Sequence, residues 1–166
     1  MIETFQEYTA RLLSLSAGAD PLEVLDTTPV TIAKWIAGRN ADDLRRAPGQ
    51  GRWSIAQIVA HLADSEIVFA YRVRMILSSP GVDIQAYDQD AWSRAQHAES
   101  SDPQQSLALF TAIRRSMLPL LRGLTAEELD RYGIHAERGK ESVRHLLALY
   151  AGHDRNHLAQ IERLLT

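Results

Sequence analysis

Two histidines near the carboxyl end of the chain have the spacing of a metal-binding pair. His153 and His157 are four residues apart, so on a helix they share one face with their Cβ atoms ~5–6 Å apart. Two imidazoles at that separation can bind one metal ion. The spacing is also common by chance, and two core histidines that each find a hydrogen-bond partner would produce the same pattern. For the pair alone, metal binding and core packing both stay open.

His61 is the candidate third ligand. It lies at the edge of an apolar stripe, beside Ile58 and Leu62, on a different predicted helix. Three neutral histidines with an open fourth position are typical of a catalytic zinc site, because structural sites usually close their coordination with protein atoms. Water bound at such a position becomes more acidic and available for attack or proton transfer. The chain of 166 residues has no cysteine, so histidine and carboxylate side chains must hold any metal.

The remaining three of the six histidines receive no role. His145 falls on the face of its helix opposite to His153 and His157, and is expected in solvent. His97 and His135 fall in predicted loops. The candidates for chemistry therefore reduce to three histidines.

Three other side chains could assist at a site. Arg114 lies near the apolar stripe of its helix and could bind a substrate carboxylate or phosphate. The favoured interpretation is an edge arginine whose stem packs while its head reaches water. Asp88 and Tyr87 could provide an acid, a base or a hydrogen bond at the mouth of a pocket, with loop capping as the competing explanation.

Asp64 and Asp154 follow His61 and His153 closely in sequence, and both are expected to be poor ligands for a metal shared with those histidines. The side chain of Asp154 turns ~100° away from that of His153. Either carboxylate could hydrogen-bond an imidazole from outside the metal site, but a solvent-exposed face is the favoured interpretation. Glu66 is an imperfect match for the face of His61, and Trp53 is best explained by packing at the start of its helix.

Capping residues and breakers divide the chain into the elements that must position these side chains. Ser54 with Gln57 forms a capping box, and Thr28 followed by Pro29 and Asp102 followed by Pro103 each mark another helix start, with the first residue as the cap. The predicted helices cover residues 4–16, 30–37, 54–79, 102–123 and 142–165, with a capped turn at 125–129 and a further turn opening at Pro21. Pro119 is expected to kink or interrupt its helix.

The chain is predicted to be all-α, with a single domain over residues 1–166. No run of β-branched residues alternates with polar ones, so strands are not supported. Residues 79–101 are long for a connection between bundle helices, where ~2–8 residues is usual. A connection of that length can run back along the bundle and allow successive helices to be parallel. Four principal helices with one crossover are therefore expected.

Composition excludes several classes of protein. The charged fraction of 23% and apolar fraction of 45% indicate a folded chain, and a net charge of −3 gives no reason to expect nucleic acid as a partner. The first 18 residues lack a basic region and a long apolar core, so they do not resemble a signal peptide. No window approaches the ~18 apolar residues of a membrane span. The sequence predicts a cytoplasmic protein that binds no membrane.

Two segments of the sequence resemble a known family. The stretch from Trp53 to Glu66, WSIAQIVAHLADSE, and the stretch from Gly152 to Ile161, GHDRNHLAQI, are similar to the signatures of the DinB/YfiT-like superfamily. Tyr87, Asp88 and Trp92 in the crossover also resemble the family pattern. The resemblance implies an up-down-down-up four-helix bundle in which His61, His153 and His157 bind zinc or nickel.

The resemblance also implies a set of activities. Characterised relatives include thiol S-transferases that use bacillithiol or mycothiol, a mycothiol-dependent maleylpyruvate isomerase and proteins labelled as hydrolases, and relatives are often homodimers. We therefore expect a metal-dependent enzyme acting on a small molecule, with thiol transfer ahead of hydrolysis and a non-enzymatic metal-stabilised or ligand-binding bundle as the opposing class. Because the chain has no cysteine, a small-molecule thiol must supply any reacting sulfur.

Overall fold

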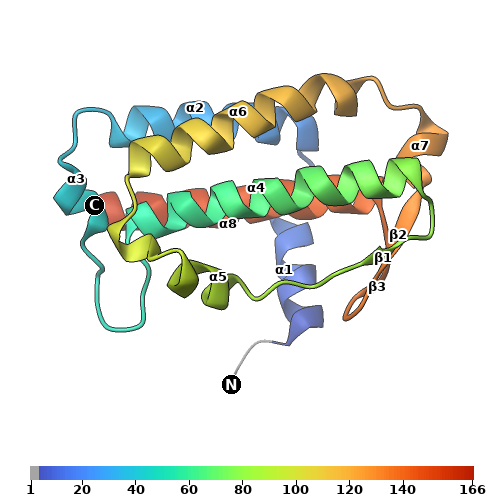
Figure 1. The fold of residues 1–166 in the computed structure, drawn as a ribbon. Helices are drawn as coiled ribbons and strands as arrows, with labels where there is room; N and C mark the ends of the chain where they lie inside the picture. The colour runs from blue at the N-terminus through green and yellow to red at the C-terminus, as the bar shows by residue number, and fades with distance from the viewer. Residues whose placement is uncertain (1–3) are drawn as a thin grey trace.

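Four long helices lie side by side in the computed structural model, which describes residues 4–166 (Figure 1). They are α2 (Pro21–Ile36), α4 (Ile55–Ser78), α6 (Pro103–Arg122) and α8 (Val143–Leu165). The shorter elements are α1 (Phe5–Ser16), α3 (Ala41–Arg45), α5 (Gln89–Ala95), α7 (Ala126–Asp130), the 3₁₀ turn η1 (Ala98–Ser100), and strands β1 (Asp83–Ile84), β2 (Tyr132–His135) and β3 (Gly139–Ser142).

The four long helices follow an up-down-down-up course. In Figure 1, α4 and α6 run in the same direction, while α2 and α8 run in the opposite one. The chain between α4 and α6, which contains β1, α5 and η1, returns along the bundle so that α6 starts beside the start of α4. The predicted four-helix bundle and its long crossover are confirmed.

Side-chain caps begin the helices where the sequence predicts them. Ser54 and Gln57 form the expected reciprocal capping box at the start of α4, and Asp102 accepts backbone N–H groups at the start of α6. Ser142 caps α8 in the same way. Each cap pairs backbone donors that the first turn of a helix leaves free, which fixes where the helix begins. Pro119 does not interrupt α6, which continues to Arg122.

The prediction for α2 was wrong at its start. The helix begins at Pro21, capped by Asp20, and Pro29 lies in its interior. Thr28 does not cap a helix; its hydroxyl donates to the Val24 carbonyl at 2.8 Å. Because proline has no N–H, Pro29 leaves the Leu25 carbonyl without its intrahelical donor.

The prediction that strands are absent was also wrong. β1 pairs in parallel with β2, and β2 pairs antiparallel with β3, which leads directly into α8. Strands of two to four residues are too short to show alternation of polar and apolar residues. Gly133 in β2 packs so closely on the Ile84 side chain that a Cβ would collide with it.

The buried apolar side chains form two clusters, one toward each end of the bundle. Phe69 and Met117 belong to one cluster, and Ile58 and Phe110 to the other. Both clusters contain side chains from α2, α4, α6 and α8. Buried polar side chains lie between the two clusters in sequence on the same helices, namely Glu66, Arg114, His153, Asp154 and His157, and His61 lies within the α4 run of the cluster that contains Ile58. The polar groups therefore interrupt the core and must satisfy one another.

Among the helices of the described chain, none combines the length and the apolar character that a membrane span requires.

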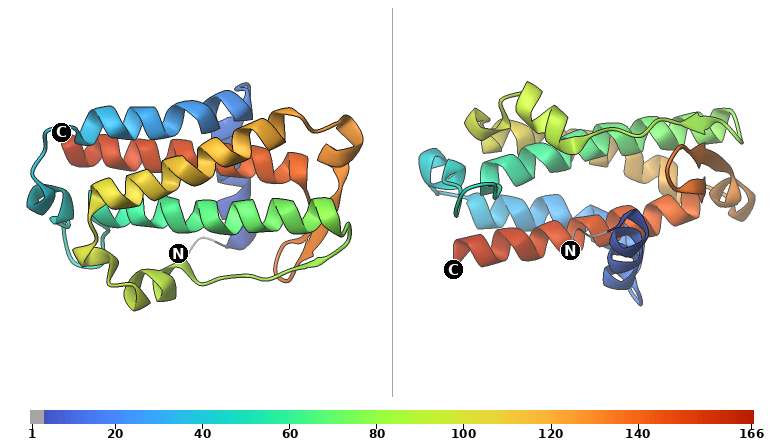
Figure 2. Two further views of the ribbon diagram at one scale, coloured as in Figure 1. Left: turned by 45° about the horizontal axis from the view of Figure 1, so that its top comes forward. Right: turned by 90° about the horizontal axis from the view of Figure 1, so that it is seen from below.

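Helix α1 lies outside the four-helix set, across α8 (Figure 2). At the crossing, a Cβ on Gly152 would overlap the backbone of Leu12. Glycine is thus required here by close approach of two backbones, in a helix where alanine would otherwise be preferred.

We predict that Gly152→Ala destabilises the protein, by about 2 kcal/mol, because the added methyl group must push α1 away from α8. In a chain of this size the melting temperature should fall by about 4–8 °C. Thermal unfolding followed by circular dichroism measures it. Gly123→Ala is the matched control, because its Cβ would meet only ordinary contacts at 3.4 Å or more. An unchanged or higher melting temperature for Gly152→Ala would contradict the proposed crossing.

Candidate metal centre

Three imidazoles from two helices converge on one point. His61 Nε2 on α4 lies 2.9 Å from His153 Nε2 on α8, and His157 Nε2 lies 3.1 Å from the same atom. One nitrogen from each ring lies within 4.8 Å of the others, and all three side chains are buried. The convergence requires α4 and α8 to pack closely, and the i,i+4 spacing of the pair on α8 supplies the rest.

Hydrogen bonding determines which nitrogen of His157 is free to bind a ligand. His157 Nδ1 lies 2.8 Å from Gln160 Oε1. Because an amide oxygen only accepts, Nδ1 carries the proton and Nε2 presents a lone pair toward the other two rings. A single proton on His153 Nε2 cannot bridge both neighbouring nitrogens, whereas one cation can accept a lone pair from all three. The three side chains therefore fit a divalent metal ion.

Burial keeps the imidazoles neutral. It lowers the pKa of His61 and His153 well below the ordinary value, and the neighbouring histidines add to the effect. Burial also lowers the pKa of His157 to about 4, against the opposing effect of the hydrogen bond that its Nδ1 donates to Gln160. At neutral pH all three rings are in the deprotonated form that binds metal.

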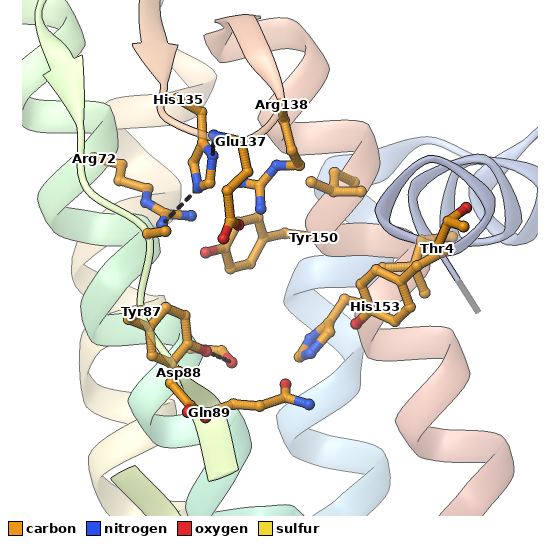
Figure 3. Close-up of a pocket in the computed structure, with 15 residues that line it drawn as sticks. Thr4, Arg72, Tyr87, Asp88, Gln89, His135, Glu137, Arg138, Tyr150 and His153 are labelled. Carbon is orange, nitrogen blue, oxygen red and sulfur yellow. Dashed lines mark hydrogen bonds between the residues drawn. The ribbon is translucent and has the colours of Figure 1, made fainter. Parts of the chain in front are cut away.

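A pocket of about 570 Å³ opens beside the cluster, with His153 in its wall (Figure 3). Tyr87 and Asp88 line it from the crossover, as the sequence predicted, and Tyr8 and Leu12 line it from α1 together with Thr4, which caps that helix. Tyr150 lies between His153 and the strands in the close-up view. A volume of this size suits a small-molecule ligand.

The family model described as the DinB superfamily matches residues 24–161. The chain belongs to the DinB superfamily. The match includes the three histidines and the four long helices almost completely.

Two relatives carry names that refer to a metal. The Bacillus subtilis protein named "Putative metal-dependent hydrolase YfiT" is 30% identical over 145 residues, which cover 86% of this chain and 81% of YfiT. A relative from Oceanobacillus iheyensis, also named a putative metal-dependent hydrolase, is 28% identical over 145 residues. The match covers 87% of this chain and 83% of the relative.

Solved structures agree with this membership. The YfiT structure, described as an unusual four-helix bundle, superposes with a TM-score of 0.81 at 29% identity and covers 87% of this DinB protein and 83% of YfiT. A mycothiol-dependent maleylpyruvate isomerase superposes with a TM-score of 0.64 at 10% identity, covering 87% of this chain and 59% of the isomerase. The second likeness concerns the fold alone.

The prediction for Arg114 was wrong. Its side chain is 1% exposed, so its head does not reach water, and it does not line the pocket. The guanidinium donates to Glu66 and to Asp154, each at 2.8 Å. Burial acts to lower the pKa of Arg114, but the two carboxylates outweigh it and raise that pKa, so the charge is retained. Arg114 is therefore an internal ion-pair residue, with no free face for a substrate.

The carboxylates beside the histidines also differ from expectation. Asp154 is 1% exposed, where a solvent-exposed face was expected, and it bonds Arg114 rather than an imidazole. Glu66 is buried as well, and burial raises the pKa of its carboxyl group against the opposing charge of Arg114. Asp64 is half-buried and accepts from Gln96 Nε2 at 3.3 Å.

Tyr87 and Asp88 each make local contacts in addition to lining the pocket. Tyr87 Oη lies 2.9 Å from Ser65 Oγ, which lies 3.4 Å from His61 Nε2. Burial raises the pKa of Tyr87, so its hydroxyl keeps its proton. Asp88 Oδ1 accepts the backbone N–H groups of Asp90 and Ala91, so it caps α5 as the competing explanation held.

Trp53 and two histidines outside the centre, His145 and His97, fall partly as expected. Trp53 packs against the apolar cluster that contains Ile58, and its ring also lies 4.9 Å from that of His61. His145 is only partly exposed, with Nε2 3.9 Å from Glu141 Oε1. His97 is exposed and lies just before η1.

Sequence reasoning missed the far wall of the pocket. Arg72, His135, Glu137 and Arg138 all line it, and His135 lies in β2 rather than in a loop. Arg72 follows His61 by about three helical turns of ~3.6 residues, so helical periodicity would have placed both on one face. The other three depend on strand pairing, for which the sequence carries no clear pattern.

We predict that Arg114→Met destabilises the protein by about 3–5 kcal/mol, because it leaves two buried carboxylates without a counter-charge. The melting temperature should fall by about 6–20 °C. Combining it with Glu66→Gln and Asp154→Asn should recover most of the loss, because the triple variant buries no net charge.

Arg122→Met on the same helix is the control. Its ion pair with Asp26 is half exposed on both sides, so it should cost less than about 1 kcal/mol. If Arg114→Met and Arg122→Met unfold at the same temperature, the network does not stabilise the bundle.

Proposed function

We propose that this DinB protein is a metal-dependent enzyme in which His61, His153 and His157 hold one divalent ion, zinc or nickel, beside a small-molecule pocket. The observation that carries the proposal is the convergence of three buried Nε2 atoms at 2.9 and 3.1 Å, with His153 in the wall of that pocket. Three protein ligands leave a coordination position for a reactant. When bound, such an ion lowers the pKa of a thiol or a water molecule that reaches this position.

Transfer of an external thiol is the activity that we propose first. Attack by water needs a base to take its proton, and the two carboxylates next to the imidazoles, Glu66 and Asp154, are both bound to Arg114. A thiol, with an ordinary pKa of ~8.5, ionises far more readily than water. The chain has no cysteine, so a low-molecular-weight thiol such as bacillithiol or mycothiol would supply the sulfur.

Hydrolysis is the second candidate, because the relatives at 30% and 28% identity carry the name of a metal-dependent hydrolase. In either reaction, Tyr87 and Ser65 would serve as a hydroxyl pair beside His61. Tyr87 keeps its proton and can donate a hydrogen bond to a developing negative charge on the substrate.

We predict that the purified protein binds one zinc or nickel ion per chain. His153→Ala should weaken binding by more than about 100-fold, because even loss of a hydrogen-bond partner of a ligand costs ~10–100-fold. Gln160→Ala, which removes such a partner from His157, should fall within that smaller range. Elemental analysis gives the stoichiometry, and calorimetric titration of chelator-treated protein gives the affinity.

His97→Ala is the matched control, because it removes an exposed imidazole far from the centre in sequence. It should bind metal as the wild type does. Equal affinity in His97→Ala and His153→Ala, with both variants folded by circular dichroism, would exclude the three-histidine site.

We predict that the metal-loaded protein conjugates bacillithiol or mycothiol to monobromobimane. In this reaction the sulfur forms a bond to carbon, bromide leaves and the thiol proton passes to solvent. A thiol with a pKa of ~8.5 is only ~3% ionised at pH 7, so complete ionisation would accelerate conjugation about 30-fold. The rise in bimane fluorescence measures the rate.

The same protein is tested in parallel with p-nitrophenyl esters in the absence of thiol, and His61→Ala is the inactive control for both reactions. Ester hydrolysis that depends on His61, without any acceleration of thiol conjugation, would favour the hydrolase and refute thiol transfer.

A further inference from the structure

Arg72 is a second buried arginine, at the opposite wall of the pocket from the imidazoles. It projects from α4 and is 4% exposed, and it lines the same cavity as His153. In Figure 3 Arg72 and His135 lie together near the strands, with Tyr150 between them and His153. One cavity thus joins a guanidinium to the candidate metal centre.

Unlike Arg114, Arg72 has no carboxylate partner in the described part of the chain. Its Nη2 donates to the Gln85 carbonyl at 2.8 Å and lies 3.3 Å from His135 Nε2. Its Nε is buried and has no hydrogen-bond partner at all. A buried guanidinium that bonds only neutral groups retains an uncompensated charge, and an anion in the pocket would neutralise it.

His135 presents a second donor at the same place. The Glu137 backbone N–H donates to His135 Nδ1 at 3.2 Å, so that nitrogen carries the lone pair of the neutral ring. The proton is then on Nε2, which faces the N–H groups of Arg72. Two donors that face each other need an acceptor between or beside them. Burial, followed by the charges of Arg138 and Arg72, lowers the pKa of His135 to about 4 and keeps the ring neutral.

The other charged side chains of the cavity do not neutralise Arg72. Arg138 is engaged by Glu141 through two bonds of 2.7 and 3.0 Å. The carboxylates of Glu137 and Asp88 line the cavity, but among the described residues neither comes within 4.0 Å of Arg72. Their negative charge disfavours a dianion. One uncompensated guanidinium therefore matches a singly charged carboxylate better than a phosphate dianion.

We propose that Arg72, assisted by His135, is a substrate-binding subsite for a carboxylate, so that the small molecule reacting beside the three histidines carries a carboxylate at its other end. The inference rests on the proposed function for the reaction, but binding of the carboxylate requires no metal. Arg72 is a specificity-determining residue: it recognises the substrate at a distance from the reacting atoms.

Thermal unfolding of the metal-free, chelator-treated protein tests the subsite, with benzoate as the probe and benzamide as its uncharged isostere. Sodium chloride keeps the ionic strength equal. Benzoate at about ten times its dissociation constant should raise the melting temperature of the wild type by about 3 °C, and benzamide should not. Arg72→Gln should lose the benzoate response. Arg74→Gln, an exposed arginine on the same helix outside the pocket, should keep it.

Three results would overturn the proposal: no benzoate response in the wild type, an equal response to benzamide, or an undiminished response in Arg72→Gln. An Arg72-dependent response that is stronger with inorganic phosphate than with benzoate would show that the subsite binds phosphate in preference to carboxylate. If Arg72→Gln does not fold, Arg72→Lys, which retains the charge but not the planar fork, should weaken the response, and the benzoate–benzamide contrast needs only the wild type. Because metal is absent throughout, a negative result in this test does not contradict the three-histidine metal centre. A protein that binds no metal would likewise not contradict the carboxylate subsite.

Discussion

The Arg114 guanidinium contacts all four long helices, and the arrangement of the buried polar groups depends on it. It projects from α6 and bonds Glu66 on α4, Asp154 on α8 and the Leu25 carbonyl on α2. That carbonyl is free because Pro29 cannot donate to it. Glu66 lies five residues after His61, and Asp154 adjoins His153, so binding both carboxylates to one guanidinium sets the axial register of α4 against α8. The same register brings the imidazoles together.

Local signals in the sequence were sufficient for most of the bundle. Capping at Ser54, Asp102 and Ser142 predicted where three of the long helices begin, because a cap acts on the backbone beside it. The fourth start was misplaced: Thr28 and Pro29 carry the same local signal as a true cap, and only the distant Arg114 accommodates a proline inside α2. Local rules fail where a tertiary contact replaces the hydrogen bond that they assume.

In the candidate site, too, the residues that regular helices position could be predicted, and those that depend on tertiary contacts could not. The convergence of His61 with the pair on α8 followed from helical spacing and a family resemblance, since each ligand lies on a regular helix. His135 could not be placed, because it enters the pocket through the pairing of β1, β2 and β3, which are too short to leave a pattern. The burial of Arg114 was also hidden, since its carboxylates are 48 and 40 residues away in sequence. Helical periodicity identifies which residues share one face of a helix, but it does not identify the residues of other elements that pack against that face.

One physical effect, removal from water, acts differently on the two kinds of cationic side chain in this molecule. A buried histidine gives up its proton, so His61, His153 and His157 are neutral, and each can present a nitrogen lone pair to a cation between them. A buried arginine does not lose its charge and must be paired instead. Arg114 is paired by two carboxylates of the chain, whereas Arg72 is held by the neutral Gln85 carbonyl at the edge of a cavity. The cavity therefore has one wall that favours a cation and another that favours an anion, a polarity that would orient an asymmetric substrate before any bond changes.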